Sequence, residues 1–139
     1  MRVVLDTNVI VSSFINPIGS PSQIMKIILN RKAELCYNTA ILNEYESVML
    51  RRKFSEKINP CHIQKFINLV TSIGISFNPF PSKVRLPDES DRIFYDTARD
   101  SGSVLITGNL KHFPKEPFIM LPVDFLKQFD IKNVKIADN

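Results

Sequence analysis

The alternation of short apolar segments with longer amphipathic ones constrains the fold of this chain more than any other feature. Five apolar runs of strand length are separated by stretches with the apolar spacing of helices. The expected strands cover residues 2–5, 35–37, 75–77, 103–107 and 118–121. A chain that alternates strands and helices forms a parallel sheet with helices on both faces. We therefore predict an α/β protein with three layers, α/β/α.

Two of the predicted helices bear on function. One follows the second strand, carries Glu44 and ends in the basic triplet 51–53, because positive charges suit the carboxyl end of a helix dipole. The other precedes the fourth strand. It is expected to be capped by Asp88 or Ser90 and to carry Asp91 in its first turn.

Length and composition fit one globular domain. The 139 residues contain no repeat, linker or low-complexity stretch, and 44% of them are hydrophobic. We predict a single domain over residues 1–139. Its last helix is expected around residues 123–129, and residues 130–139 are expected to form a loosely held tail.

The ends and cysteines of the chain are typical of a cytoplasmic protein. Met1 and Arg2 lead directly into the first strand, without the pattern of a signal peptide. Cys36 and Cys61 form no pair with metal-binding spacing, so we expect both thiols to be reduced. No apolar run reaches the roughly 18 residues of a membrane span, so we expect no membrane segment.

The charge balance is basic. Eighteen Lys and Arg stand against 14 Asp and Glu, which gives a formal net charge of +4. Such a balance suits a polyanionic partner such as RNA, but many basic domains bind no nucleic acid. The charge therefore permits a nucleic-acid function without assigning one.

Polar side chains gather where the first and fourth predicted strands end. Those that directly follow one of these strands, or end it, are Asp6, Thr7, Asn8, Thr107 and Asn109. Ligands of open parallel sheets bind beyond the carboxyl ends of the strands. If the two strands are neighbours, Asp91 and Glu44 converge with Asp6 at this edge. Asp91 shares a helix face with Phe94 and Ala98, three and seven residues further on.

Several carboxylates in one pocket repel each other. At about 5 Å and an effective dielectric near 20, the cost is roughly 3 kcal/mol per pair. A bound divalent cation removes that cost, and oxygen ligands without Cys or His favour Mg²⁺ or Mn²⁺ over zinc. Such ions polarise a phosphate and activate a water for attack on it. The pattern thus indicates an acidic metal site.

Each of these residues also has a purely structural interpretation. Asp6 suits the N-cap of the helix after the first strand, and Asp91 suits the helix dipole. Glu44 and Glu46 lie on opposite borders of one apolar stripe, so amphipathicity does not choose between them. We interpret His112 as a surface or hydrogen-bonded histidine in preference to a catalytic base.

Three segments resemble one known family. The segment Val3–Val9 is similar to the opening of PIN domains, and Asp91, seven residues before Ala98, resembles their third acidic position. Residues 104–114 (VLITGNLKHFP) are similar to the fourth-strand motif of the PIN branch described as toxins of toxin–antitoxin pairs. The resemblance spans nearly the whole chain. It implies a sheet of order 3-2-1-4-5, a homodimer, an antitoxin partner and cleavage of RNA.

The same resemblance assigns roles to individual residues. It implies that Asp6, Glu44 and Asp91 bind Mg²⁺ or Mn²⁺ as catalytic metal ligands. Asn109 stands where many members carry a fourth acid. An amide there positions a water or a phosphate but adds no charge, so it leaves open whether one or two metals bind. Thr7 and Thr107 are expected to hydrogen-bond the pocket carboxylates or a phosphate of the RNA. Lys111, Arg51 and Arg52 are expected to contact the RNA backbone, although the two arginines equally suit a plain helix terminus. The predicted activity is metal-dependent endoribonuclease.

Two other functions are weighed against this prediction. A non-catalytic RNA-binding module of the same fold is the main alternative, and Asn109 is the residue that favours it. An aspartyl phosphatase of the haloacid-dehalogenase type needs a second Asp two residues after the first, and Asn8 occupies that place. Asn8 therefore counts against the phosphatase.

Overall fold

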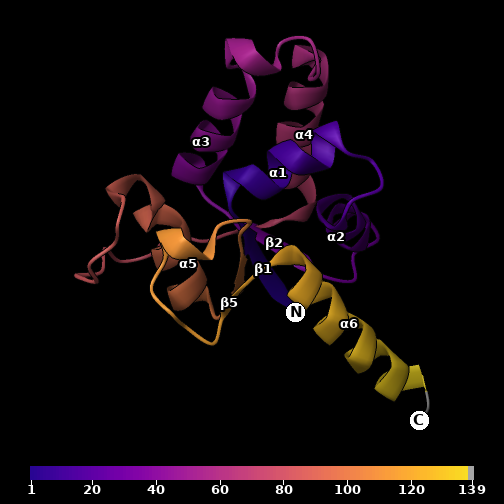
Figure 1. Cartoon of the computed structure of the whole chain (residues 1–139), viewed down its shortest axis with the longest axis vertical. Helices are drawn as coiled ribbons and strands as arrows, with labels where there is room; N and C mark the ends of the chain where they lie inside the picture. Colours follow the sequence, from indigo (N-terminus) through magenta and orange to yellow (C-terminus); the bar gives the residue numbers. More distant parts are fainter. Residues whose placement is uncertain (138–139) are drawn as a thin grey trace.

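The computed structural model describes residues 1–137, and its centre is a five-stranded sheet (Figure 1). The strands are β1 (Arg2–Leu5), β2 (Glu34–Tyr37), β3 (Ile75–Ser76), β4 (Val104–Ile106) and β5 (Ile119–Met120). Their order is β3-β2-β1-β4-β5, and every neighbouring pair is parallel. Val3, Val4 and Leu5 of the central strand are fully buried, as expected for a strand covered on both faces. The predicted sheet and its order are confirmed.

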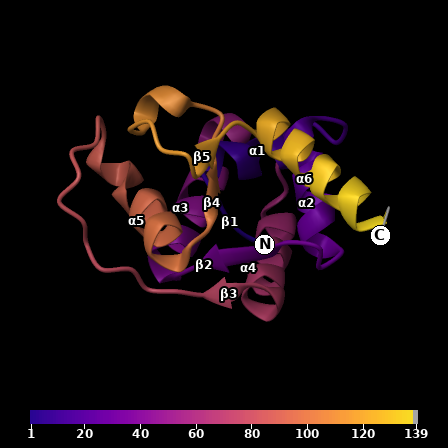
Figure 2. The same ribbon diagram turned by 90° about the horizontal axis from the view of Figure 1, so that it is seen from below.

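Helices cover both faces of this sheet. The α-helices are α1 (Thr7–Ile15), α2 (Ser20–Leu29), α3 (Thr39–Met49), α4 (Pro60–Ile73), α5 (Arg92–Ser101) and α6 (Pro122–Ala137). Short 3₁₀ helices are η1 (Arg52–Phe54), η2 (Glu89–Asp91) and η3 (Leu110–His112). Figure 2 shows α5 on one side of the sheet and α2 and α6 on the other, which confirms the three-layer α/β/α architecture.

Local signals explain where α4 begins and where α5 ends. The side chain of Asn59 accepts a hydrogen bond of 2.9 Å from the backbone N–H of Cys61, and Pro60 is the first residue of α4. Gly102 follows α5 with a φ of +68°, a left-handed conformation that glycine adopts without strain. The chain then turns directly into β4.

A buried tyrosine fixes α3 against the end of β1. The ring of Tyr45 lies between Phe66 of α4 and Phe94 of α5, with ring centroids 6.1 Å apart in both pairs. Its hydroxyl donates a 2.6 Å hydrogen bond to the carbonyl of Leu5. Figure 1 shows α3 and α4 side by side, standing away from the sheet. The tyrosine therefore connects this helical pair to the point where β1 ends.

Side chains of α5 hold the proline-rich segment that precedes η2. The backbone N–H groups of Ser82 and Phe80 donate to the carboxylates of Asp96 and Asp100, at 3.0 and 2.9 Å. Arg92 donates to the carbonyl of Ser82 at 2.8 Å. The two accepting carboxylates are four residues apart on the helix, and the two donating N–H groups are two residues apart on the extended segment. Both spacings cover about 6 Å, so each N–H group lies opposite a carboxylate. This match fixes the segment that leads into η2.

The carboxyl-terminal helix is longer than the sequence suggested. We expected it to end near residue 129, but α6 continues to Ala137. Residues 130–137 contain neither glycine nor proline, and nothing in them stops a helix. Whether residues 130–137 are loosely held stays a prediction, and residues 138–139 lie outside the described part of the chain.

The basic triplet lies beyond the end of α3. We expected residues 51–53 in the last turn, but the helix ends at Met49 with Leu50 as its C-cap. Arg51 precedes η1, and the triplet is exposed in the turn toward α4. After the turn, Phe54 is partly buried and packs against the core.

Two smaller expectations concern cysteines and membranes. Within residues 1–137 both cysteines are free, with Cys36 buried and Cys61 exposed. None of the helices in the same range combines the length and the apolar character needed to cross a bilayer.

Candidate active site

Asp6 lies where β1 passes into α1, beside the end of β4. Its backbone N–H donates to the carbonyl of Ile106 at 3.0 Å, so the residues that follow the two strands meet. Its side chain is 5% exposed, and Oδ1 accepts the backbone N–H of Thr7 at 2.8 Å. Oδ2 accepts the hydroxyl of Thr107, also at 2.8 Å. Asp6 is therefore both the helix cap and a pocket residue.

The environment of Asp6 raises its pKa above the ordinary value. Burial is the main cause, and the hydrogen bonds from Thr107 and Thr7 oppose it. A carboxylate held in this way is costly to leave ionised without a positive partner. A bound cation is such a partner.

Asn8 connects the two strand ends, a role that the sequence did not indicate. Its amide nitrogen donates to Asp6 Oδ2 at 3.3 Å, and its amide oxygen accepts the backbone N–H of Gly108 at 3.0 Å. A Cβ at position 108 would lie 3.3 Å from that oxygen, so a larger residue crowds the contact. The sequence placed Asn8 among the polar residues at this edge of the sheet and used it against a phosphatase, but it assigned Asn8 no contact.

Asp91 approaches Asp6 from η2, at the start of α5. Its side chain is 14% exposed, and its pKa is raised to about 6. Burial is the largest cause, followed by the negative charge of Asp6; His112 opposes the shift, and Glu44 adds a smaller contribution. Asp91 Oδ2 is buried and, among the described residues, has no hydrogen-bond partner. The pair of coupled carboxylates predicted from the sequence is thus present.

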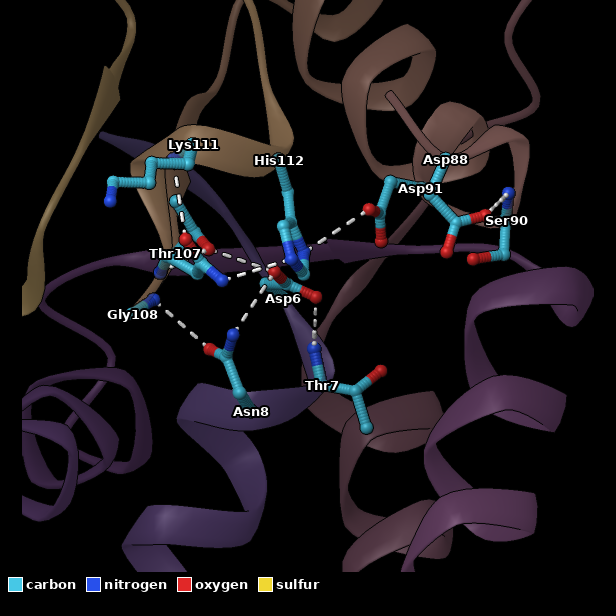
Figure 3. A network of polar contacts seen from close by, with 11 residues as sticks. Asp6, Thr7, Asn8, Asp88, Ser90, Asp91, Thr107, Gly108, Lys111 and His112 are labelled. Carbon is cyan, nitrogen blue, oxygen red and sulfur yellow. Dashed lines mark hydrogen bonds and ion pairs between the residues drawn. The ribbon is translucent and has the colours of Figure 1, made fainter. Parts of the chain in front are cut away.

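The helix cap next to Asp91 is Asp88. Asp88 precedes η2 and accepts the backbone N–H of Ser90 at 2.9 Å, as one of the two predicted caps. The helix expected here begins as a 3₁₀ turn, with α5 proper starting at Arg92. Asp91 ends that turn, and its carboxylate faces the pocket (Figure 3).

Glu44 is placed better than Glu46 for a part in the site. Glu44 is half-buried, whereas Glu46 is exposed, and the charge of Glu44 contributes to the raised pKa of Asp91. In the described part of the chain, however, no three His, Cys, Asp or Glu side chains lie close enough together to hold one metal ion. The structure brings Asp6 and Asp91 together and leaves Glu44 further away.

Asn109 and His112 complete the opposite wall of the pocket. The side-chain nitrogen of Asn109 lies 2.9 Å from His112 Nε2, and His112 Nδ1 lies 3.5 Å from Asp91 Oδ2. Figure 3 shows the imidazole above Asp6 and beside Asp91. The hydrogen-bonded surface histidine of the sequence interpretation is present, but its place beside the carboxylates was missed. The spacing of three residues from Asn109 was the available signal.

The residues predicted to contact RNA occupy different places. Thr107 is fully buried, and its hydroxyl donates a hydrogen bond to the carboxylate of Asp6. The Thr7 hydroxyl is buried without a partner among the described residues. Lys111 is exposed, and its side chain points away from the carboxylates in Figure 3. Arg51 and Arg52 are exposed in the turn after α3. Contacts of these residues with RNA stay predictions.

The donor set of this pocket suits a hard divalent cation. The charge of the buried Asp6 helps to raise the pKa of the half-buried Asp91, and one oxygen of Asp91 has no hydrogen-bond partner among the described residues. Oxygen ligands of this kind are those that Mg²⁺ and Mn²⁺ prefer. The oxygen donors of Asp6 and Asp91 therefore fit such an ion.

An α/β/α fold with one carboxylate at the end of β1 and a second in the turn before α5 defines a class, and three comparisons place the chain within it. Residues 2–111 match the family model of the PIN domain. A protein of Methanocaldococcus jannaschii, uncharacterized protein MJ1680, is 32% identical over 110 residues, which cover 78% of this chain and 71% of the relative. The chain belongs to the PIN-domain family, whose members are generally nucleases.

A solved structure has the same fold. The crystal structure of VapBC2 from Rickettsia felis, bound to a DNA fragment from its promoter, matches with a TM-score of 0.60 and 17% identity. The match covers 87% of this chain and 97% of the other.

Proposed function

We propose that this protein is an endoribonuclease that hydrolyses RNA phosphodiester bonds with the help of Mg²⁺ or Mn²⁺. Asp6 and Asp91 hold the ion, and Glu44 completes the site directly or through a water. The observation that carries the proposal is the pair of carboxylates, one buried and one half-buried, in which the charge of Asp6 helps to raise the pKa of Asp91 to about 6. Membership of a nuclease family supports it.

The chain's own residues prepare this site. A bound divalent cation supplies charge that polarises the phosphate and favours ionisation of a water. Thr107 and the backbone N–H of Thr7 hold the carboxylate of Asp6 in one orientation. The 3₁₀ turn before α5 holds Asp91 opposite. Orientation before substrate arrives lowers the barrier, because the pocket does not reorganise during the reaction.

Three exposed basic residues are the proposed contacts with the RNA backbone. Lys111, Arg51 and Arg52 are exposed, and the chain carries a net charge of +4. Contacts between such residues and phosphates make affinity fall steeply as salt concentration rises. RNA as the substrate also supports action in the cytoplasm.

The toxin of a toxin–antitoxin pair is the cellular role we propose. The fold likeness to VapBC2 and the fourth-strand motif over residues 104–114 support it. In that role a protein antitoxin binds the chain, and two copies of the chain form a homodimer.

An RNA-binding module without cleavage is the second candidate. Two observations favour it: Asn109 adds no charge, and the described residues contain no three-residue metal cluster. Retention of RNA that needs metal, without cleavage, distinguishes it from a nuclease.

The test is a cleavage assay on a labelled, partly structured RNA with Mn²⁺, with Mg²⁺ and with EDTA. We expect metal-dependent cleavage by the wild type and none by Asp6→Asn or Asp91→Asn. Glu44→Gln should lose activity, while Glu46→Gln, two residues along the same helix and exposed, should retain it. Equal cleavage by Asp6→Asn and wild type contradicts the proposal. Metal-dependent binding without cleavage favours the second candidate.

A further inference from the structure

Asn109 is connected to both carboxylates of the pocket. Its backbone N–H donates to the Thr107 hydroxyl at 3.1 Å, and that hydroxyl donates to Asp6 Oδ2 at 2.8 Å. Its side-chain nitrogen lies 2.9 Å from His112 Nε2, and His112 Nδ1 lies 3.5 Å from Asp91 Oδ2. One residue thus reaches Asp6 through a threonine and Asp91 through a histidine.

The backbone fixes which way the Asn109 amide faces. The amide oxygen accepts the backbone N–H of Lys111 at 3.3 Å, at the start of η3. A backbone N–H only donates, so the atom that faces it is the oxygen, and the NH₂ group faces His112. An NH₂ group also only donates. His112 Nε2 therefore accepts, and in the neutral ring the proton resides on Nδ1.

This tautomer directs an N–H at the oxygen of Asp91 that lacks a partner. Asp91 Oδ2 is buried and receives no hydrogen bond from the described residues, and His112 Nδ1 is the nitrogen that faces it (Figure 3). Buried polar atoms are nearly always paired, so a donor is needed at this place. At 3.5 Å the contact is longer than a hydrogen bond, and such contacts often tighten when substrate binds.

We infer that Asn109 sets the tautomer of His112, so that His112 is a positioning residue that orients the carboxylate of Asp91 by donating from Nδ1. Asn109 is then not a weakened form of an acidic metal ligand. A carboxylate at position 109 accepts hydrogen bonds and places the proton on Nε2. The lone pair of Nδ1 then faces the lone pairs of Asp91, and the contact becomes repulsive.

The tautomer is tested by ¹⁵N–¹H multiple-bond correlation spectra of the imidazole rings, recorded with EDTA at mildly alkaline pH. The chain has two histidines, and His62, which is exposed, serves as the internal reference. We expect His112 with its proton on Nδ1 in the wild type and with a proton on Nε2 in Asn109→Asp. Asn68→Asp, the same change at an exposed site on α4, should leave His112 unchanged.

Two results overturn the inference. One is a wild-type His112 with its proton on Nε2. The other is an Asn109→Asp variant whose neutral His112 ring carries its proton on Nδ1 and none on Nε2. Both measurements are made without metal and without RNA, so they do not depend on nuclease activity.

The consequence for the pocket rests on the proposed metal site and is measured as Mn²⁺ affinity by titration calorimetry. We expect His112→Ala to weaken binding about tenfold, as loss of a group that orients a ligand does. His112→Asn should restore much of the affinity, because its amide nitrogen takes the place of Nδ1. Asn109→Asp should bind Mn²⁺ more weakly than wild type although it adds a negative charge.

The outcomes separate the inference from the function. Tighter Mn²⁺ binding by Asn109→Asp overturns the inference and leaves a metal-dependent nuclease intact. Absence of Mn²⁺ binding in the wild type contradicts the proposed function, while the tautomer result stands by itself.

Discussion

The two carboxylates of the pocket are held in different ways. Asp6 is 5% exposed and accepts three hydrogen bonds, from Thr7, Asn8 and Thr107. Asp91 is 14% exposed, and its buried Oδ2 has no hydrogen-bond partner among the described residues. Asp6 lies where β1 passes into α1, hydrogen-bonded to the end of β4, whereas Asp91 ends a short 3₁₀ turn.

The difference suggests that the two carboxylates have separate roles in binding a cation. A carboxylate with several donors is fixed in position, and its charge is partly compensated by the protein. A carboxylate with fewer donors, which Asp91 remains when His112 is its one donor, keeps more of its capacity for a ligand, at a cost in stability. We expect Asp6 to set the position of a bound cation and Asp91 to provide most of the drive to bind it.

The largest expected effect is on activity. Asp6→Asn keeps the shape of the side chain and the helix cap but removes the charge, so we expect RNA cleavage to fall about 1,000-fold, or about 4 kcal/mol. The variant should stay folded, although its NH₂ group replaces an oxygen that accepts a hydrogen bond in the wild type. Single-turnover cleavage and a melting curve on the same preparation check both statements. If Asp6→Asn is inactive because it has unfolded, the loss of activity does not show that the charge of Asp6 is needed.

A smaller effect is expected on the stability of the Asp6 side. Thr107→Val keeps the volume of a fully buried side chain but removes the hydroxyl that donates to Asp6 Oδ2. The carboxylate loses a donor, so we expect the free energy of unfolding to fall by about 2 kcal/mol. Urea titration measures it, with Thr71→Val at an exposed position of α4 as the control. Equal values for the two variants would contradict the role of Thr107.

The attachment of α3 to the same strand end predicts a third effect. Tyr45→Phe removes the 2.6 Å hydrogen bond to the Leu5 carbonyl and leaves the ring in place, at an expected cost of about 1 kcal/mol. Tyr37→Phe is the matched control, because its hydroxyl makes only an exposed 3.4 Å contact with the Thr71 carbonyl. If urea titration gives the same loss for both, the buried bond does not stabilise α3.

The sequence indicated the sheet and the Asp6 side of the pocket well. Strand β1 is a continuous apolar run that ends at Asp6, and the fourth strand ends at Thr107 in the same manner, so periodicity predicted both strands. That the two strands are neighbours was implied only by the resemblance to PIN domains. The helix cap at Asp6 was also visible, although it was weighed against the pocket role. The structure shows that one carboxylate serves both, with one oxygen for each.

The Asp91 side was harder to anticipate. His112 stands 21 positions after Asp91, and only the packing of η3 against η2 brings them together. Asn8 and Gly108 likewise meet across a hundred positions. The end of α6 was misjudged because a missing stop signal was given too little weight. Local patterns specify elements, whereas side-chain pairs between elements depend on the packing of the whole fold.

The smallest expected effect is an increase in stability, whereas the two preceding variants are expected to lose stability. Burial and the charge of Asp6 raise the pKa of Asp91 from 3.8 to about 6, so the folded chain holds this proton more tightly than the unfolded one. Without metal, stability contributed by the protonated group is full below pH 3.8 and is lost as pH rises through about 6. Asp91→Asn should therefore be more stable than wild type at pH 7 in EDTA, by about 1 kcal/mol or about 4 °C in Tm, since partial exposure screens the effect. The gain should vanish near pH 4, where Asp91 is largely protonated. Added Mn²⁺ should raise the Tm of the wild type and not of the variant, and a variant less stable than wild type in EDTA at pH 7 would show that Asp91 is as well satisfied as Asp6.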